Sequence, residues 1–261
     1  MSKPWARGKE GVIRMGSRGA RAPRAAGGEM GGFGWALAFF VLIHVGVSAT
    51  GLRTRLVGWI GEGPYRAVFS LVSLALLAWL IQSYGAMRAD PFDPLNEAAW
   101  APPSWLRWPS YALTFFGVSL AVAGVLTPGP TFAGFERRGL ERPEPAHGVL
   151  RITRHPFLWG IALWAAGHLL VNGERSAVML FGALGLMVIF GARSIDRKGR
   201  ARPGEGWDAF EDVTSNAPFV AITQGRNRLA LGEIGWRGLV GIAAAVLIAL
   251  AHGRLFGVDA L

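Results

Sequence analysis

The chain of 261 residues contains no cysteine and few charged side chains. Without cysteine it can form no disulfide, no iron–sulfur cluster, no thiolate-ligated haem and no cysteine-bound zinc site. Only 17% of its residues are Asp, Glu, Lys or Arg, whereas a soluble domain has about a quarter. The scarcity of charge, beside 51% hydrophobic residues, indicates a protein that lies in a membrane.

Apolar runs of about 17–20 residues recur along the chain, long enough to cross a hydrocarbon core of ~30 Å. Such runs form helices, because backbone groups in lipid must be hydrogen-bonded within their own segment. Membrane strands would alternate apolar and polar residues, which these runs do not. We therefore predict an all-α fold, a polytopic integral membrane bundle of about six transmembrane helices. The predicted spans are Phe33–Thr50, Ala67–Ala86, Trp108–Leu126, Phe157–Val171, Ser176–Ala192 and Trp236–His252.

The predicted organisation has three parts. Residues 1–32 form a basic tail rich in Gly, Ala and Arg, which we expect to be disordered, and Met30 offers an alternative start. Residues 33–252 form the transmembrane domain, and residues 253–261 form a short C-terminal tail.

The net charge of +10 would suggest nucleic acid in a soluble protein. Here the basic residues lie between apolar runs, where anionic lipid head groups explain them better, so we expect membrane lipid and no nucleic acid as partner. Connections 51–66, 127–156 and 193–235 hold three, five and seven Lys or Arg, against two and one in 87–107 and 172–175.

The positive-inside rule then places the three basic connections in the cytoplasm, in what we expect to be a bacterial inner membrane. The seven basic residues of the N-terminal tail oppose this orientation, and a start at Met30 would remove the conflict.

Two histidines, His44 and His168, lie within apolar spans. At ~1.5 Å per residue each is roughly 15–18 Å from the start of its span, near the membrane midplane. An ionisable side chain at that depth indicates a functional site. The first and fourth spans run antiparallel, so the two imidazoles can face each other as the axial ligands of haem b. The alternative is a histidine bonded to a carbonyl of a neighbouring helix.

A third candidate is the pair Arg154 and His155, directly before Pro156 at the start of the fourth span. Proline is tolerated in the first turn of a helix, and a helix N-terminus favours anions. The pair could anchor a phosphate, a carboxylate or a second cofactor, or it could be a basic stop with a capping loop. We interpret His147 and His252 as interface residues.

Several motifs resemble the NnrU family of membrane proteins over roughly residues 35–225. They are Phe40-Val-Leu-Ile-His44, Gly51-Leu-Arg53, Gly61-Glu-Gly-Pro-Tyr65-Arg66, Ser70-Leu-Val-Ser-Leu74, Arg154-His-Pro-Phe-Leu-Trp-Gly160, Trp164-Ala-Ala-Gly-His168-Leu-Leu-Val-Asn-Gly173, Asp196-Arg-Lys198 and Ser215-Asn-Ala-Pro-Phe219. The family includes a haem b isomerase of carotenoid synthesis. The resemblance implies haem b with His44 and His168 as the iron ligands. Those isomerases have a cysteine at the position of Ala165. Because alanine has no thiol, a thiolate ligand from this position is excluded in this chain.

Arg154-His155-Pro156 with Gly160, followed by Glu211 and Pro218-Phe219, also resembles the isoprenylcysteine carboxyl methyltransferases. Their paired acidic residues are matched only loosely, so the likeness implies architecture more than S-adenosylmethionine chemistry.

Four functions follow. The first is a haem b isomerase acting on a lipophilic polyene, such as the carotenoid 15-cis-zeta-carotene, with His44 and His168 as ligands. The second is a haem protein for electron transfer, sensing or assembly in nitrite and nitric oxide metabolism. The third is a methyltransferase using Arg154, His155 and Glu211, and the fourth is a membrane scaffold. We favour the first two.

Overall fold

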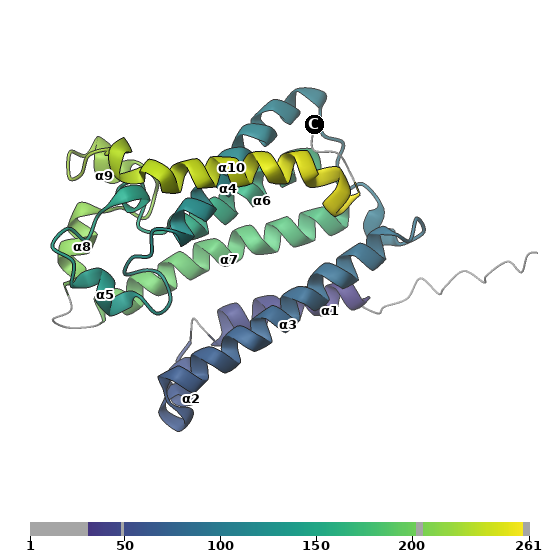
Figure 1. The fold of residues 1–261 in the computed structure, drawn as a ribbon. Coiled ribbons are helices and arrows are strands. Elements are labelled where there is room, and N and C mark those ends of the chain that lie inside the picture. The colour runs from purple at the N-terminus through teal and green to yellow at the C-terminus, as the bar shows by residue number, and fades with distance from the viewer. Residues whose placement is uncertain (1–30, 48–49, 202–205, 258–261) are drawn as a thin grey trace, which may run out of the picture. The chain divides into compact units, whose positions relative to one another are not determined.

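The computed structural model describes residues 31–47, 50–201 and 206–257, and from Gly31 onward the chain forms one compact unit. Most of the described residues lie in helices, which confirms the all-α prediction (Figure 1). Within these ranges no strand is present, and Ala98 and Glu174 form an isolated bridge. The predicted N-terminal tail lies outside the described residues, apart from its last two positions.

Six helices account for most of the apolar sequence. They are α1 (Gly32–Leu42), α3 (Glu62–Arg88), α4 (Arg107–Val125), α6 (Pro156–Val171), α7 (Arg175–Arg200) and α10 (Leu231–Phe256). The shorter elements are a π-helical turn (Ile43–Val47), α2 (Leu52–Ile60), α5 (Glu136–Leu140), α8 (Trp207–Val213), α9 (Val220–Thr223), and 3₁₀ turns at Pro94–Asn96, Ser104–Leu106 and Gly148–Arg151.

Each predicted span contains a helix, but the helices are not equally long. Four are long and apolar enough to cross a membrane, namely α3, α7, α10 and α4 with its preceding turn. A fifth span results if the bent pair Gly32–Val47 and Leu52–Ile60 is counted as one. The fourth predicted span, α6, is apolar but has only 16 residues. Two of the about six predicted spans, the first and the fourth, thus contain only short helices.

Two helices extend well beyond the C-terminal ends of their predicted spans. α7 continues eight residues past Ala192 to Arg200, and α10 continues four residues past His252 to Phe256. Residues 253–256, which the sequence analysis assigned to the C-terminal tail, are therefore helical. The physical reason is that a helix does not have to end where the apolar run ends, because long charged side chains reach the head groups while their stems stay in apolar surroundings.

The helices pack through small residues. α4 contacts α6 and α10, α6 also contacts α7, and α1 contacts α3 and α7. At the α4–α6 contact a Cβ atom on Gly160 would lie 2.5 Å from the Ala121 backbone nitrogen, and one on Gly117 would lie 2.6 Å from the Trp164 nitrogen. The two backbones therefore touch where neither residue has a side chain, as is common between membrane helices.

Polar contacts gather the connections into two groups. Connections 87–107 and 172–175 meet through the Ala99 N–H, which donates to the Gly173 carbonyl at 2.7 Å, and an ion pair between Arg88 and Glu174. The three basic connections are joined by other ion pairs, which are Arg66–Glu136, Arg151–Glu233 and Arg154–Glu211. These are the same two groups of loops that the charge count assigns to opposite sides of a membrane.

The close α4–α6 contact gives a test. We expect Gly160→Ala to destabilise the protein by about 1–3 kcal/mol, because the added methyl group would overlap backbone atoms of α4. Gly182→Ala on α7 is the matched control, since a Cβ there would meet nothing within 4 Å. Thermal unfolding of both variants in detergent measures the difference, and equal melting temperatures would contradict the contact.

Candidate functional site

His44 lies in the π-helical turn that follows α1. Its Nδ1–H donates a hydrogen bond of 2.7 Å to the Phe40 carbonyl, four residues earlier. The imidazole packs on the Phe40 ring, with centroids 4.4 Å apart, and meets the edge of Phe69 on α3 at 5.6 Å. The carbonyl fixes the proton on Nδ1, so Nε2 keeps its lone pair.

His168 is held in the same manner on α6. Its Nδ1–H donates to the Trp164 carbonyl at 2.9 Å, again four residues earlier. The ring stacks on Phe181 of α7, with centroids 4.5 Å apart. His168 lies three residues before the end of α6, where the Asn172 side chain donates to its carbonyl. It therefore lies near the end of its helix, which stops at Val171 like the predicted span.

In both cases the accepting carbonyl belongs to the histidine's own helix, and not to a neighbouring helix as the structural alternative supposed. This arrangement sets the tautomer and leaves Nε2 of each ring as the nitrogen able to bind iron. His44 and His168 have no ring contact with each other and pack on different aromatic residues. Both histidines lie on elements that contact α7, namely α6 and the π-helical turn.

The described residues include no group of three or more His, Asp or Glu side chains that could hold a bare metal ion. Haem iron requires fewer protein ligands, because the porphyrin supplies four and the protein needs to supply only one or two. The donor chemistry of His44 and His168 fits a haem iron better than it fits a protein-bound zinc or non-haem iron.

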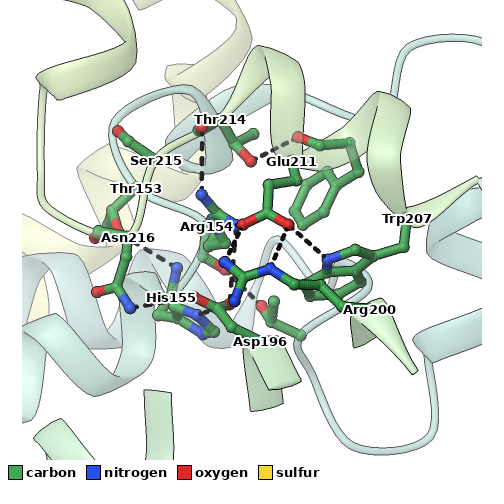
Figure 2. A network of polar contacts seen from close by, with 12 residues as sticks. Thr153, Arg154, His155, Asp196, Arg200, Trp207, Glu211, Thr214, Ser215 and Asn216 are labelled. Carbon is green, nitrogen blue, oxygen red and sulfur yellow. Dashed lines mark hydrogen bonds and ion pairs between the residues drawn. The ribbon is translucent and has the colours of Figure 1, made fainter. Parts of the chain in front are cut away.

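A second polar centre lies where α6 begins (Figure 2). We call Arg154, His155, Asp196, Arg200 and Glu211 the α6 cluster. Nη1 of Arg154 donates to Glu211 Oε1 at 2.7 Å and lies 3.9 Å from Asp196 Oδ1. His155 Nε2 is 2.7 Å from Asp196 Oδ1, and Arg200 pairs with Glu211. The cluster joins the start of α6 to the end of α7 and to α8.

Local sequence explains this position. Pro156 is the first residue of α6, as predicted, so the chain enters the helix from a loop. That loop is fixed by backbone bonds, because the Arg154 N–H donates to the Ser215 carbonyl at 2.9 Å and the Phe219 N–H donates to the Ile152 carbonyl at 2.8 Å. The side chains of Arg154 and His155 are thereby held inward, and both are buried.

The charges in the α6 cluster balance. The hydrogen bond from Arg200 has the largest effect on Glu211 and the one from Arg154 adds to it, and together they lower the pKa of the Glu211 carboxyl from 4.5 to about 2. Glu211 also accepts a hydrogen bond from the indole N–H of Trp207. Two arginines thus face two carboxylates in a partly dry site. The cationic partners needed by the predicted anion anchor are already paired within the chain.

The sequence analysis singled out His44, His168, Arg154, His155 and Glu211, and the structure brings the last three together in the α6 cluster, while the two other histidines pack on different aromatic rings. His147 has its Nδ1 3.3 Å from the Pro145 carbonyl in a loop, and His252 lies near the end of α10, beside Phe256. Asp196 was the residue missed as a partner. Its signal was a single carboxylate in a run of basic residues at the end of an apolar span.

These features define the class of protein as an all-α integral membrane protein with imidazoles in its apolar helices. More specifically, the chain belongs to the NnrU family, because the family described as "NnrU protein" matches residues 33–260. Two curated proteins are similar to it, both named 15-cis-zeta-carotene isomerase, chloroplastic. The one from Zea mays is 31% identical over 194 residues and the one from Arabidopsis thaliana 29% identical over 222 residues.

The matched segments cover 73% and 83% of this chain but only 50% and 56% of those relatives, so the chain spans about half their length. No solved structure matches the chain. The comparisons identify the family, and they leave the histidines to be tested by experiment.

The low pKa of Glu211 gives a pH test. A carboxyl with a depressed folded pKa contributes stability that is fully present above ~4.5 and is lost as the pH falls through about 2. We expect Glu211→Gln to lower the melting temperature at pH 6–7, and the difference from wild type to shrink steadily below pH 4.5. Glu141→Gln is the control, because the Arg137–Glu141 pair is exposed. A pH-independent difference would contradict the ion pairs.

Proposed function

We propose that this protein is a haem b-binding membrane isomerase that interconverts cis and trans double bonds in a lipophilic polyene, such as 15-cis-zeta-carotene. The observation that carries the proposal is the matched setting of His44 and His168. The Nδ1–H of each imidazole donates a hydrogen bond to a backbone carbonyl, which leaves the Nε2 lone pair able to bind iron. The two similar proteins named as zeta-carotene isomerases support the substrate class.

His44 and His168 would hold the iron, and bound haem would supply a Lewis-acidic metal able to bind a double bond and weaken its π character. The residues of this chain contribute the rest. The backbone carbonyls of Phe40 and Trp164 orient the two rings, and Phe69 and Phe181 pack against them. The rings are thus fixed by apolar surroundings and by one hydrogen bond each.

The proposed reaction requires no general acid or base, because isomerisation transfers no proton. This matches the composition around the two histidines, since α1, the π-helical turn after it and α6 contain no Asp or Glu. The carboxylates near α6 lie in the α6 cluster at its first turn, about 20 Å along the helix from His168 at ~1.5 Å per residue. We therefore assign the α6 cluster no role in isomerisation.

We further propose an orientation with connections 51–66, 127–156 and 193–235 on the cytoplasmic side of a bacterial inner membrane. It is supported by the Lys and Arg counts and by the ion pairs that gather these three connections.

Haem ligation is tested by absorption spectroscopy. Protein purified from haem-replete cells should show a Soret band that is lost when both His44→Ala and His168→Ala are made, because the iron then has no axial imidazole. His147→Ala, in a loop outside the apolar helices, is the control and should keep the band. A colourless wild-type protein would refute haem binding.

Isomerase activity is tested separately. Purified protein, reduced and kept in the dark, should convert 15-cis-zeta-carotene to isomers separable by chromatography, and the double histidine variant should convert at least a hundredfold less. A haem-loaded wild type that leaves the isomer ratio unchanged would refute the isomerase and keep the haem, which points instead to electron transfer or sensing in nitrogen-oxide metabolism.

A further inference from the structure

Two cavities lie side by side where the loop after α4 meets α7. Both are lined by Thr131, Ala133 and Ile195, so they share a wall. The larger has a volume of about 260 Å³ and the smaller of about 130 Å³. We call the larger one the apolar cavity and the smaller one the charged cavity, because their linings differ in chemistry.

The apolar cavity is bounded by the last turn of α4 and the first turn of α6. Its walls include Phe132 and Phe157. Two hydroxyls in the lining, those of Thr127 and Thr131, already donate hydrogen bonds to backbone carbonyls of the chain. An apolar cavity of ~150 Å³ accommodates benzene, so this larger one has room for a short stretch of hydrocarbon chain.

The charged cavity has Arg53, Lys198 and Glu136 in its lining. Arg53 pairs with Glu62 at 2.6 Å, and Glu136 pairs with Arg66 at 3.3 Å. Arg66 also pairs with Glu62 at 2.9 Å. Among these five groups three cations stand beside two carboxylates, so one positive charge is in excess. The charged cavity therefore attracts an anion.

The two cavities differ in their position along α7. Ile195 lines both, whereas Lys198 and Gly199, one turn farther from the predicted span, line the charged cavity. The Trp207 ring occupies the space where a side chain on Gly199 would lie, and it lines the same cavity. Indole rings favour the interface between lipid and water. The apolar cavity thus lies toward the spans and the charged cavity toward the loops, which is the polarity of a membrane lipid.

We propose that the two cavities form one site for an anionic phospholipid, with its phosphate in the charged cavity and the beginning of one acyl chain in the apolar cavity. Basic pockets between membrane helices are suited to anionic head groups. The excess positive charge selects an anionic head group over a zwitterionic one, and the apolar cavity selects a lipid over a free phosphate. The site is independent of haem and of isomerase activity, because neither His44 nor His168 lines it.

The experiment is a native mass spectrometry titration of the full chain, delipidated in detergent, with two lipids that have the same acyl chains. Dioleoylphosphatidylglycerol is anionic, and dioleoylphosphatidylcholine is zwitterionic. We expect the first molecule of phosphatidylglycerol to bind about tenfold more tightly than that of phosphatidylcholine. Glycerol 3-phosphate, which has the phosphate but no acyl chain, should not displace it at equal concentration. Equal affinity for the two lipids, or displacement by glycerol 3-phosphate, would overturn the proposal.

A charge variant locates the head group. Lys198→Gln removes one cation from the lining and should lower the affinity for phosphatidylglycerol about tenfold, to that of phosphatidylcholine. Arg197→Gln is the matched control, because it removes the same charge from the next residue of α7, which is exposed and outside both linings. Its affinity should equal that of wild type. Equal losses in the two variants would mean attraction to the general surface charge and would overturn the site.

A size variant tests the wall that the cavities share. Ala133→Leu, at an exposed position that lines both, should weaken phosphatidylglycerol binding about tenfold because the added side chain fills the passage between head group and acyl chain. Ala112→Leu, at an exposed position on α4 outside both linings, should bind like wild type. Unchanged binding in Ala133→Leu would refute the proposal, whatever the charge variants show.

Discussion

The paired charges of the α6 cluster are the interaction on which this end of the protein depends. Arg154 and His155 are buried beside an apolar helix, where an unpaired charge is very costly. They are tolerated because Glu211 and Asp196 come to them from α8 and α7. To bring these carboxylates there, the end of α7 and α8 must both lie against the start of α6. Charge pairing therefore fixes the position of α8.

The apolar bundle and its histidines could be predicted from local sequence. Run length indicates a helix in lipid, and one imidazole in an apolar run is conspicuous, so His44 and His168 were found without any knowledge of their neighbours. What these predictions share is that the information lies within one or two turns of helix.

The remainder could not be predicted because it depends on distant residues. His155 and Asp196 are 41 positions apart, and nothing in either segment indicates that they meet. Gly117 and Gly160 are ordinary helical glycines until the backbones of α4 and α6 approach each other.

The shortness of α6 has a mechanical consequence. Its 16 residues rise ~24 Å at ~1.5 Å each, which is several ångströms less than the ~30 Å hydrocarbon slab. A bilayer adapts to such a mismatch by thinning locally, at a cost that grows with the mismatch. The acyl-chain length of the lipids thus affects this protein through the short helix α6. Thicker membranes strain the short helix that carries His168 and begins directly after His155, while the neighbouring α7, ten residues longer, accommodates them by tilting.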